Sequence, residues 1–215
     1  MNGIDAETLR GSIPHGTLLV VSAPSGAGKT SLSRALLSLF PDLRQSVSFT
    51  TRSPRAKEKE GVDYYFIAGR EFDEMVRQGD LAEWAVVHGN RYGTSKATLD
   101  AALRQGQDIL LDIDCQGAAQ LKESCRQGVF IFILPPSLEE LKKRLEKRNT
   151  DAAADVEIRL QNARREIAAA SWYDYIVIND DFGRALEELK SIVLSERCRA
   201  ARRFGFVKKF FPGAD

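Results

Sequence analysis

Several short runs of the chain are almost continuously apolar, and amphipathic segments separate most of them. A strand that is covered on both faces has this composition, whereas a strand with one solvent-exposed face alternates apolar and polar residues. The intervening segments repeat their apolar residues at helical spacing or end at a helix stop, as at Pro41 and Gly106. Strand and helix therefore alternate, which predicts an α/β fold with a central parallel sheet. The expected strands cover residues 17–22, 46–50, 108–113, 129–134 and 174–179, and the expected helices 30–40, 96–106 and 181–200.

Two stretches break this alternation. Residues 51–97 open with a charged loop and continue with short strand-like pieces, which predicts a small α+β insertion. Residues 138–171 are charged and helical with a weak apolar face, which predicts a helical lid on the core. The expected organisation is one domain over residues 16–205, with a core of 16–50, 98–137 and 172–205 and terminal tails at 1–15 and 206–215.

The composition is that of a folded protein with little net charge. Hydrophobic residues make up 43%, charged residues 28%, and the formal net charge is +1. A nucleic-acid-binding surface usually shows a stronger basic bias, and no apolar run is long enough to cross a bilayer. Three widely spaced cysteines and two histidines argue against a disulfide framework and a zinc site. We therefore expect a cytoplasmic protein with neither nucleic acid nor membrane as its partner.

The segment SAPSGAGKTS, residues 22–31, joins the first apolar run to the first amphipathic one. The segment fits the phosphate-loop pattern GxxxxGK[ST] between a strand and a helix, except that Ala23 stands where the pattern has its first glycine. Glycines let successive backbone N–H groups turn toward phosphate oxygens, the lysine adds a mobile positive charge, and the hydroxyl can bind Mg²⁺. An ordinary glycine turn is the alternative, and the combination of strand, loop, Lys-Thr pair and helix weighs against it. The predicted phosphate-binding residues are Ala23, Pro24, Ser25, Gly26, Ala27, Gly28, Lys29 and Thr30.

Two acidic residues, Asp112 and Asp114, stand at the end of the apolar run 108–113. An acid at the end of a buried strand beside a phosphate loop can reach Mg²⁺ or its bound waters. We assign Asp112, with Thr30, to the metal. Asp114 is equally suited to cap the helix expected at residue 115, and the local sequence leaves both roles open.

The insertion carries side chains suited to a second anion and to a base edge. Arg52 and Arg55 stand three apart around a proline, and guanidinium groups match the oxygens of a phosphate dianion. Tyr64 and Tyr92 offer hydroxyl groups, and a carboxylate such as Glu83 can accept hydrogen bonds from a base. Taken singly, each has an ordinary explanation as a solvated loop arginine or a packing tyrosine.

In combination, these motifs resemble the guanylate kinase family. The resemblance covers about residues 16–200 and implies a P-loop NTPase three-layer fold. It also implies an enzyme that transfers the γ-phosphoryl group of ATP to GMP, with Mg²⁺ as cofactor. The chain departs from the family pattern at Lys57, Arg91 and Asn149. The motifs that carry the resemblance are SAPSGAGKT, SVSFTTRSPR, GVDYYF, EWAVVHGNRYGTS, LDIDCQG, FILPPSLEELKKRLEKR and YDYIVINDD.

Family roles pass to the matching residues of this chain. The resemblance implies that Arg52, Arg55, Tyr64 and Tyr92 bind the GMP phosphate, and that Ser48, Glu83, Thr94 and Asp114 read guanine. It implies that Asn179 lines the adenine pocket of ATP. The implied catalytic residues are Lys29, Arg52, Arg144, Arg148 and Arg159.

The implied mechanism is direct in-line transfer. A phosphate monoester is largely a dianion at neutral pH, so the GMP phosphate needs no general base. Two other functions stay open as alternatives: another small-molecule kinase on the same scaffold, and a non-catalytic guanylate-kinase-like binding module. The resemblance leaves homo-oligomerisation open and implies dGMP as a further acceptor. We expect the basic and aromatic residues that follow 201 to extend the last helix.

Overall fold

The computed structural model describes residues 16–87, 89–124, 128–147 and 153–211. Five strands form a central sheet in the order β2-β7-β1-β8-β9, and every neighbouring pair in it is parallel. This confirms the α/β class and the central parallel sheet. The strands are β1 (Leu18–Ser22), β2 (Arg44–Gln45), β7 (Ile109–Asp112), β8 (Val129–Leu134) and β9 (Tyr175–Ile178).

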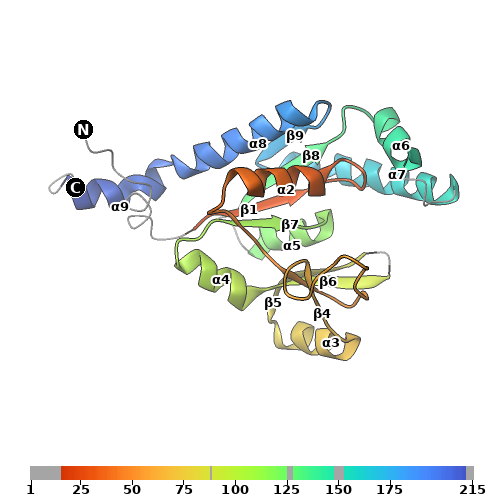
Figure 1. Cartoon of the computed structure of the whole chain (residues 1–215), viewed down its shortest axis with the longest axis horizontal. Helices are drawn as coiled ribbons and strands as arrows, with labels where there is room; N and C mark the ends of the chain where they lie inside the picture. The colour runs from red at the N-terminus through yellow and green to blue at the C-terminus, as the bar shows by residue number, and fades with distance from the viewer. Residues whose placement is uncertain (1–15, 88, 125–127, 148–152, 212–215) are drawn as a thin grey trace.

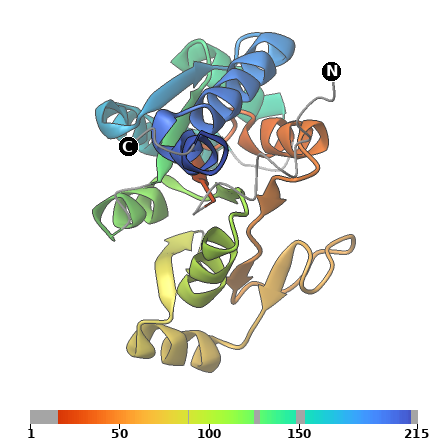
Figure 2. The same cartoon turned by 90° about the vertical axis from the view of Figure 1, so that its left-hand side faces the viewer.

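Helices cover both faces of this sheet (Figures 1 and 2). Because successive side chains of a strand point to opposite faces, β1 contributes to two separate cores. Leu19 and Val21 face one core, and Leu18 and Val20 face the other. The two cores give the expected three-layer arrangement. The first face is covered by α2 (Lys29–Leu39) and α8 (Phe182–Arg197), and the second by α4 (Lys96–Arg104), α5 (Cys115–Ser124) and η1 (Ala170–Trp172).

A second sheet lies beside the central one, in the lower half of Figure 2. Its strand order is β4-β3-β6-β5, with one parallel pair, β3 with β4, and two antiparallel pairs. Helix α3 (Gly69–Gln78) packs on this sheet through Phe72, which is fully buried and meets Trp84 edge to face. The strands are β3 (Ser48–Thr50), β4 (Tyr64–Phe66), β5 (Leu81–Val87) and β6 (Asn90–Ser95).

The strand expected at 46–50 was assigned to the wrong sheet. Only Ser48–Thr50 forms a strand there, and it pairs within the second sheet. The central sheet is completed instead by Arg44–Gln45, whose strand pairs with β7. Residues 46–49 alternate polar and apolar side chains, which is the pattern of a strand with one solvent-exposed face rather than of a strand covered on both faces.

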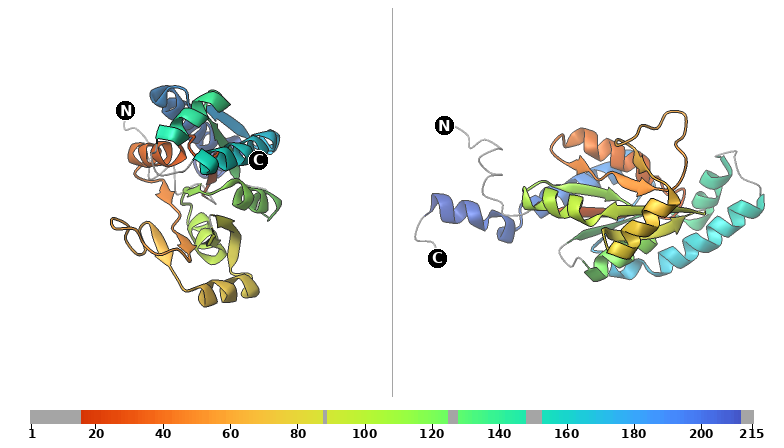
Figure 3. Two further views of the ribbon diagram at one scale, coloured as in Figure 1. Left: turned by 90° about the vertical axis from the view of Figure 1, so that its right-hand side faces the viewer. Right: turned by 90° about the horizontal axis from the view of Figure 1, so that it is seen from below.

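The helices expected at 138–171 are observed as α6 (Leu138–Lys147) and α7 (Ala153–Ala168), followed by η1, and α6 and α7 are called the lid below. The two helices share a small apolar core of their own. They lie at the end of the molecule opposite to the C-terminal helix (Figures 1 and 3). The lid core consists of Leu141, Leu145, Val156, Leu160 and Ala163.

The expectation of one continuous closing helix is wrong. Helix α8 ends at Arg197, and a separate helix, α9 (Ala200–Phe210), follows after Arg199 leaves helical geometry with a ψ of 133°. Arg197 and Arg202, one from each helix, both bind the buried carboxylate of Asp108, at 2.8 and 2.9 Å. Asp108 therefore connects the two helices across the break. No helix within the described ranges has both the length and the apolar character needed to cross a membrane.

Asp108 is therefore a test of how the C-terminal region is held. Its Oδ1 also accepts a hydrogen bond from the backbone N–H of Thr17 at 2.8 Å. Replacing it with alanine removes the carboxylate from Arg202 and from the Thr17 N–H and leaves Arg197 with only its ion pair to Asp42, and breaking a buried ion pair costs about 3 kcal/mol or more. We expect Asp108→Ala to lower the melting temperature by about 6 °C or more, measured by calorimetry.

The matched control for this variant is Glu139→Ala, which breaks an exposed i,i+4 ion pair with Lys143. Such pairs contribute less than about 1 kcal/mol. Equal melting temperatures for the two variants would contradict the anchoring role of Asp108.

Candidate functional site

The phosphate loop runs from the end of β1 to the start of α2 and contains two left-handed glycines. Gly26 has a φ of 92° and Gly28 a φ of 97°, values that other residues rarely adopt. A Cβ on Gly28 would also stand 2.3 Å from Nδ2 of Asn179. The amide of Asn179 donates a hydrogen bond to the carbonyl of Ala27 at 2.7 Å, which holds the loop against the residue that follows β9. Glycine is required at position 28 on both counts.

Lys29 links the phosphate loop to the end of β7. Its ammonium group forms an ion pair with Asp112 and donates to the carbonyl of Ile113 at 2.9 Å. Strands β1 and β7 are parallel neighbours with Val21 opposite Asp112, so both strands end at the same edge of the sheet. The two acids predicted at the end of β7 are therefore brought beside the phosphate loop.

A pocket of about 410 Å³ opens between the central sheet and the second sheet. Its lining comes from both sheets, from the first turn of α2 and from the charged loop of the insertion. The structure thus brings together residues that stand up to 85 positions apart, from Lys29 to Asp114. The predicted site residues that line it are Lys29, Thr30, Ser48, Arg55, Tyr64, Glu83, Tyr92, Asp112 and Asp114.

Glu83 is an almost fully buried carboxyl group in this pocket, with 4% of its surface exposed. Its Oε1 accepts a hydrogen bond from the hydroxyl of Thr94 at 2.6 Å, and that hydroxyl lies 3.2 Å from the hydroxyl of Ser48. Burial raises the pKa of Glu83 to about 7, the Thr94 hydrogen bond lowers this pKa, and the charge of Asp114 raises it. The structure therefore joins Ser48, Glu83 and Thr94, and it leaves a carboxyl that titrates near neutral pH.

Asp114 caps the N-terminus of α5. Its Oδ1 accepts a hydrogen bond from the backbone N–H of Gly117 at 2.8 Å, which is the capping geometry. The residue is also half-buried and lines the pocket. The capping role left open by the sequence is thus observed, and it does not remove Asp114 from the site.

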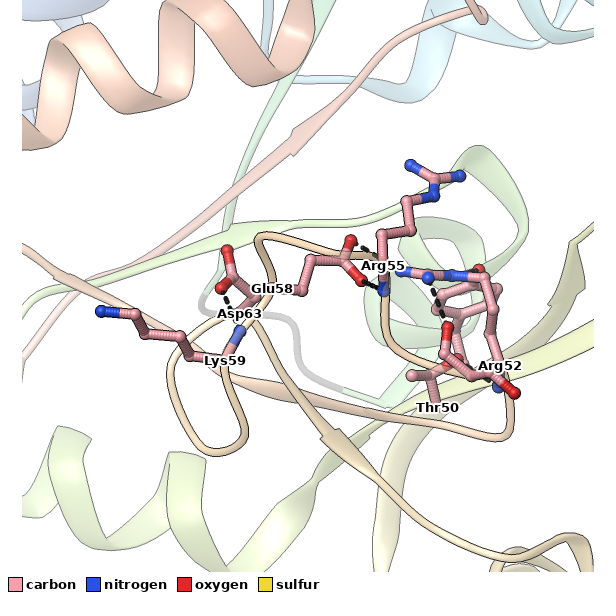
Figure 4. Close-up of polar contacts among 8 residues, drawn as sticks. Thr50, Arg52, Arg55, Glu58, Lys59 and Asp63 are labelled. Atoms are coloured by element: carbon pink, nitrogen blue, oxygen red, sulfur yellow. Dashed lines mark hydrogen bonds and ion pairs between the residues drawn. The ribbon is translucent and has the colours of Figure 1, made fainter.

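The arginines of the insertion are held by a carboxylate that the sequence did not single out (Figure 4). Glu58 accepts from the Arg52 guanidinium at 2.9 Å and from the backbone N–H of Arg55 at 2.8 Å. Arg52 also donates to the hydroxyl of Tyr92 at 3.2 Å and stacks over the ring of Tyr64. The Arg52 guanidinium holds the pKa of the Glu58 carboxyl below its usual value. The position of Glu58 three residues after Arg55 could have indicated this contact. The other charged residues of the loop made it hard to single out.

The lid approaches the site through α6. Leu141 and Leu145 lie 3.1 and 3.0 Å from where a Cβ on Gly26 would stand, so α6 packs on the phosphate loop. Arg144 donates to the carboxylate of Glu140 and to the carbonyl of Asn179, both at 3.0 Å. Arg144 is thereby fixed next to the loop.

Several predicted residues lie outside the pocket lining or outside the described residues. Arg148 lies outside the described residues. Asn179 is 6% exposed, and its amide nitrogen contacts the phosphate loop, so its predicted adenine contact stays a prediction. Arg159 is half-buried on α7. The described site residues that do not line the pocket are Arg52, Thr94, Arg144, Arg159, Asn179 and the loop residues 23–28.

The oxygen atoms near the phosphate loop suit Mg²⁺. Within the described part of the chain, no cluster of three or more histidine, cysteine, aspartate or glutamate side chains is arranged to hold a metal. Mg²⁺ is normally held by one or two carboxylates together with substrate phosphates and water. The carboxylate of Asp112 and the hydroxyl of Thr30 line the same pocket and meet that requirement.

Comparison with known proteins gives consistent relatives. A family model described as guanylate kinase matches residues 15–196. The guanylate kinase of Syntrophotalea carbinolica is 62% identical over 188 residues, which are 87% of this chain and 90% of that protein. The guanylate kinase of Geobacter metallireducens is 56% identical over 188 residues, covering 87% and 93%. The crystal structure of guanylate kinase from Anaplasma phagocytophilum superposes with a TM-score of 0.74 at 34% identity, covering 94% of this chain and 98% of that one.

The buried Glu83 carboxyl predicts a pH-dependent cost in stability. Its pKa rises from 4.5 in the unfolded chain to about 7 in the folded protein. Between these values the unfolded chain releases a proton that the folded carboxyl keeps, so the free energy of unfolding falls as pH rises and then levels off above about 7. The full difference amounts to about 3 kcal/mol. We expect Glu83→Gln to be more stable than wild type at pH 8 by up to this amount, and not at pH 4.5.

Urea unfolding at the two pH values measures this difference, and Glu123→Gln, an exposed residue on α5, is the control. A stability gain for Glu83→Gln that is the same at pH 4.5 and pH 8 would contradict the raised pKa.

Proposed function

The chain belongs to the guanylate kinase family, and on this premise we propose how its pocket performs the family reaction. The enzyme transfers the γ-phosphoryl group of ATP to GMP and yields ADP and GDP. One observation supports the assignment of the pocket above the others. A buried carboxylate, Glu83, and the phosphate-loop lysine, Lys29, line the same pocket. The base of GMP can bind Glu83 while the phosphate of GMP faces the side of the pocket that carries Lys29.

We assign guanine recognition to Glu83, Thr94, Ser48 and Asp114. Guanine presents two neighbouring donors, N1–H and the 2-amino group, and an ionised carboxylate can accept both. Adenine carries a lone pair at N1 and no amino group at C2, so it leaves a buried carboxylate without a partner. Stranding a buried polar group in this way can reject the wrong ligand by several orders of magnitude. Donation by guanine also favours the ionised form of Glu83, whose pKa lies near neutrality.

The GMP phosphate is assigned to the arginines and tyrosines of the insertion. Arg55, Tyr64 and Tyr92 line the pocket. Arg52 is attached to the same wall by its hydrogen bond to the hydroxyl of Tyr92. A phosphate dianion then meets guanidinium and hydroxyl donors, and no side chain needs to remove a proton from the nucleophile. The task left to the protein is to hold two negatively charged substrates in line.

The ATP phosphates are assigned to the loop 23–30. The left-handed glycines turn backbone N–H groups inward, and Lys29 supplies the charge that neutralises the transferring group. Asp112 and Thr30 would hold Mg²⁺, which lowers the repulsion between the phosphates when it is bound. Arg144 stands beside the loop through its bond to the carbonyl of Asn179, and this location suits a role in stabilising the transferring phosphoryl group. Closure of the lid and the insertion would exclude water from the reaction.

The direct test is ADP formation from MgATP with GMP, AMP, UMP and CMP supplied in turn. We expect a preference for GMP in kcat/KM of about 10³-fold or more, because the other bases cannot satisfy Glu83. Activity with a different acceptor would show that the protein is a kinase but would contradict the assignment of guanine recognition to Glu83. A folded protein that is inactive with all four would favour a non-catalytic binding module.

Lys29 is expected to act mainly on the transferred group. Lys29→Met keeps the length and apolar stem of the side chain and removes its charge, so we expect kcat to fall about 100-fold or more. The KM for GMP should change little, because the GMP phosphate has its own ligands. Lys143→Met removes an exposed lysine on α6 as the control. A rise in the KM for GMP at unchanged kcat would contradict the assignment.

A further inference from the structure

A glutamine of helix α5, Gln120, pairs with the backbone at the edge of the second sheet. Strand β5 is the last strand of that sheet, and its outer edge presents backbone groups to α5. The backbone N–H of Trp84 donates to Oε1 of Gln120 at 3.1 Å, and Nε2 of Gln120 donates to the carbonyl of Trp84 at 2.7 Å. The glutamine amide thus pairs with the strand as a residue of a neighbouring strand would.

The same face of α5 leaves space for the neighbouring carboxylate. Gly117 and Gln120 stand three apart, so they lie on one face of the helix. A Cβ on Gly117 would lie 2.3 Å from Oε2 of Glu83 and 3.1 Å from its carboxyl carbon. Any side chain at 117 would therefore displace the Glu83 carboxylate. The Thr94 hydroxyl holds this carboxylate through its other oxygen, Oε1.

These contacts connect two base-reading groups that come from different sheets. Asp114 belongs to the core and caps α5 by bonding to Gly117. Glu83 belongs to the second sheet, and Trp84, the residue next to it, is tied to the same helix by Gln120. The relative position of the two carboxylates therefore depends on how α5 seats on β5.

We propose that Gly117 and Gln120 are positioning residues for Glu83 and thereby set the preference for a purine that carries a 2-amino group. The inference rests on the proposed function, in which Glu83 accepts from guanine. Neither residue contacts the substrate. Two parallel hydrogen bonds from one base edge need a carboxylate held to about 0.5 Å. The Thr94 hydroxyl holds one oxygen, and the α5–β5 contact fixes the space around the other. Because Gln120 is exposed and water competes for its partners, its effect should be moderate.

The discriminating substrate is IMP, which keeps the N1–H donor of GMP and lacks the 2-amino group. Gln120→Met keeps the side-chain length and removes both hydrogen bonds to Trp84. We expect the ratio of kcat/KM for GMP to that for IMP to fall about fivefold, with the KM for ATP unchanged. The control is Gln78→Met, which removes an exposed amide bonded at 2.7 Å to Glu74 of its own helix. That control should keep the wild-type ratio.

Gly117→Ala is the second variant, and it should lower the same ratio at least as far as Gln120→Met. Its control is Gly183→Ala in the first turn of α8, where the added Cβ would come no closer than 3.3 Å to a neighbour. A folded Gln120→Met protein that keeps the wild-type ratio, or that loses GMP and IMP activity by the same factor, overturns the inference. If Gly117→Ala does not fold, Gln120→Met decides alone. A wild-type protein that does not phosphorylate GMP would instead remove the proposed function.

Discussion

A carboxylate buried between two sheets is the constraint around which this molecule is arranged. Glu83 costs free energy in its ionised form because it is removed from water, and the fold compensates for only part of that cost through the Thr94 hydroxyl. The missing side chain at Gly117 then leaves the other carboxylate oxygen its space. A carboxyl in this state is poorly solvated before a ligand arrives. In the proposed function, a guanine base supplies the hydrogen-bond donors that this carboxyl lacks.

Charged groups of both signs line the pocket, and they come from different parts of the fold. Glu83 and Asp114 lie where the second sheet meets α5. The phosphate loop and the arginines of the insertion supply the positive charge. In the proposed function, the buried Glu83 accepts from the donors on guanine, and the positive groups face the phosphates.

The sequence predicted those parts of the molecule whose signal is local. The apolar run 129–134 became β8 with the same bounds, and the phosphate loop lies between a strand and a helix as its motif requires. The sequence did not predict β6, because Asn90, Arg91 and Gly93 have low strand propensity and depend on pairing with β5. It also missed Glu58, which stands among several charges of one loop, and Gln120, whose partner Trp84 is set by a tertiary contact. The sequence also did not predict the break after α8, across which the two helices share Asp108, 89 positions from Arg197.

The central claim is that GMP binding requires the ionised form of Glu83, and proton release on binding measures it directly. Calorimetric titrations with GMP at pH 7, in buffers of different ionisation enthalpy, count the protons exchanged. Ionisation of the GMP phosphate contributes equally to the proton release of wild type and of Glu83→Gln. The difference in proton release between the two proteins therefore reports on Glu83 alone. With a pKa of about 7, wild type should release about half a proton more than the variant. Equal proton release by the two proteins would contradict the account.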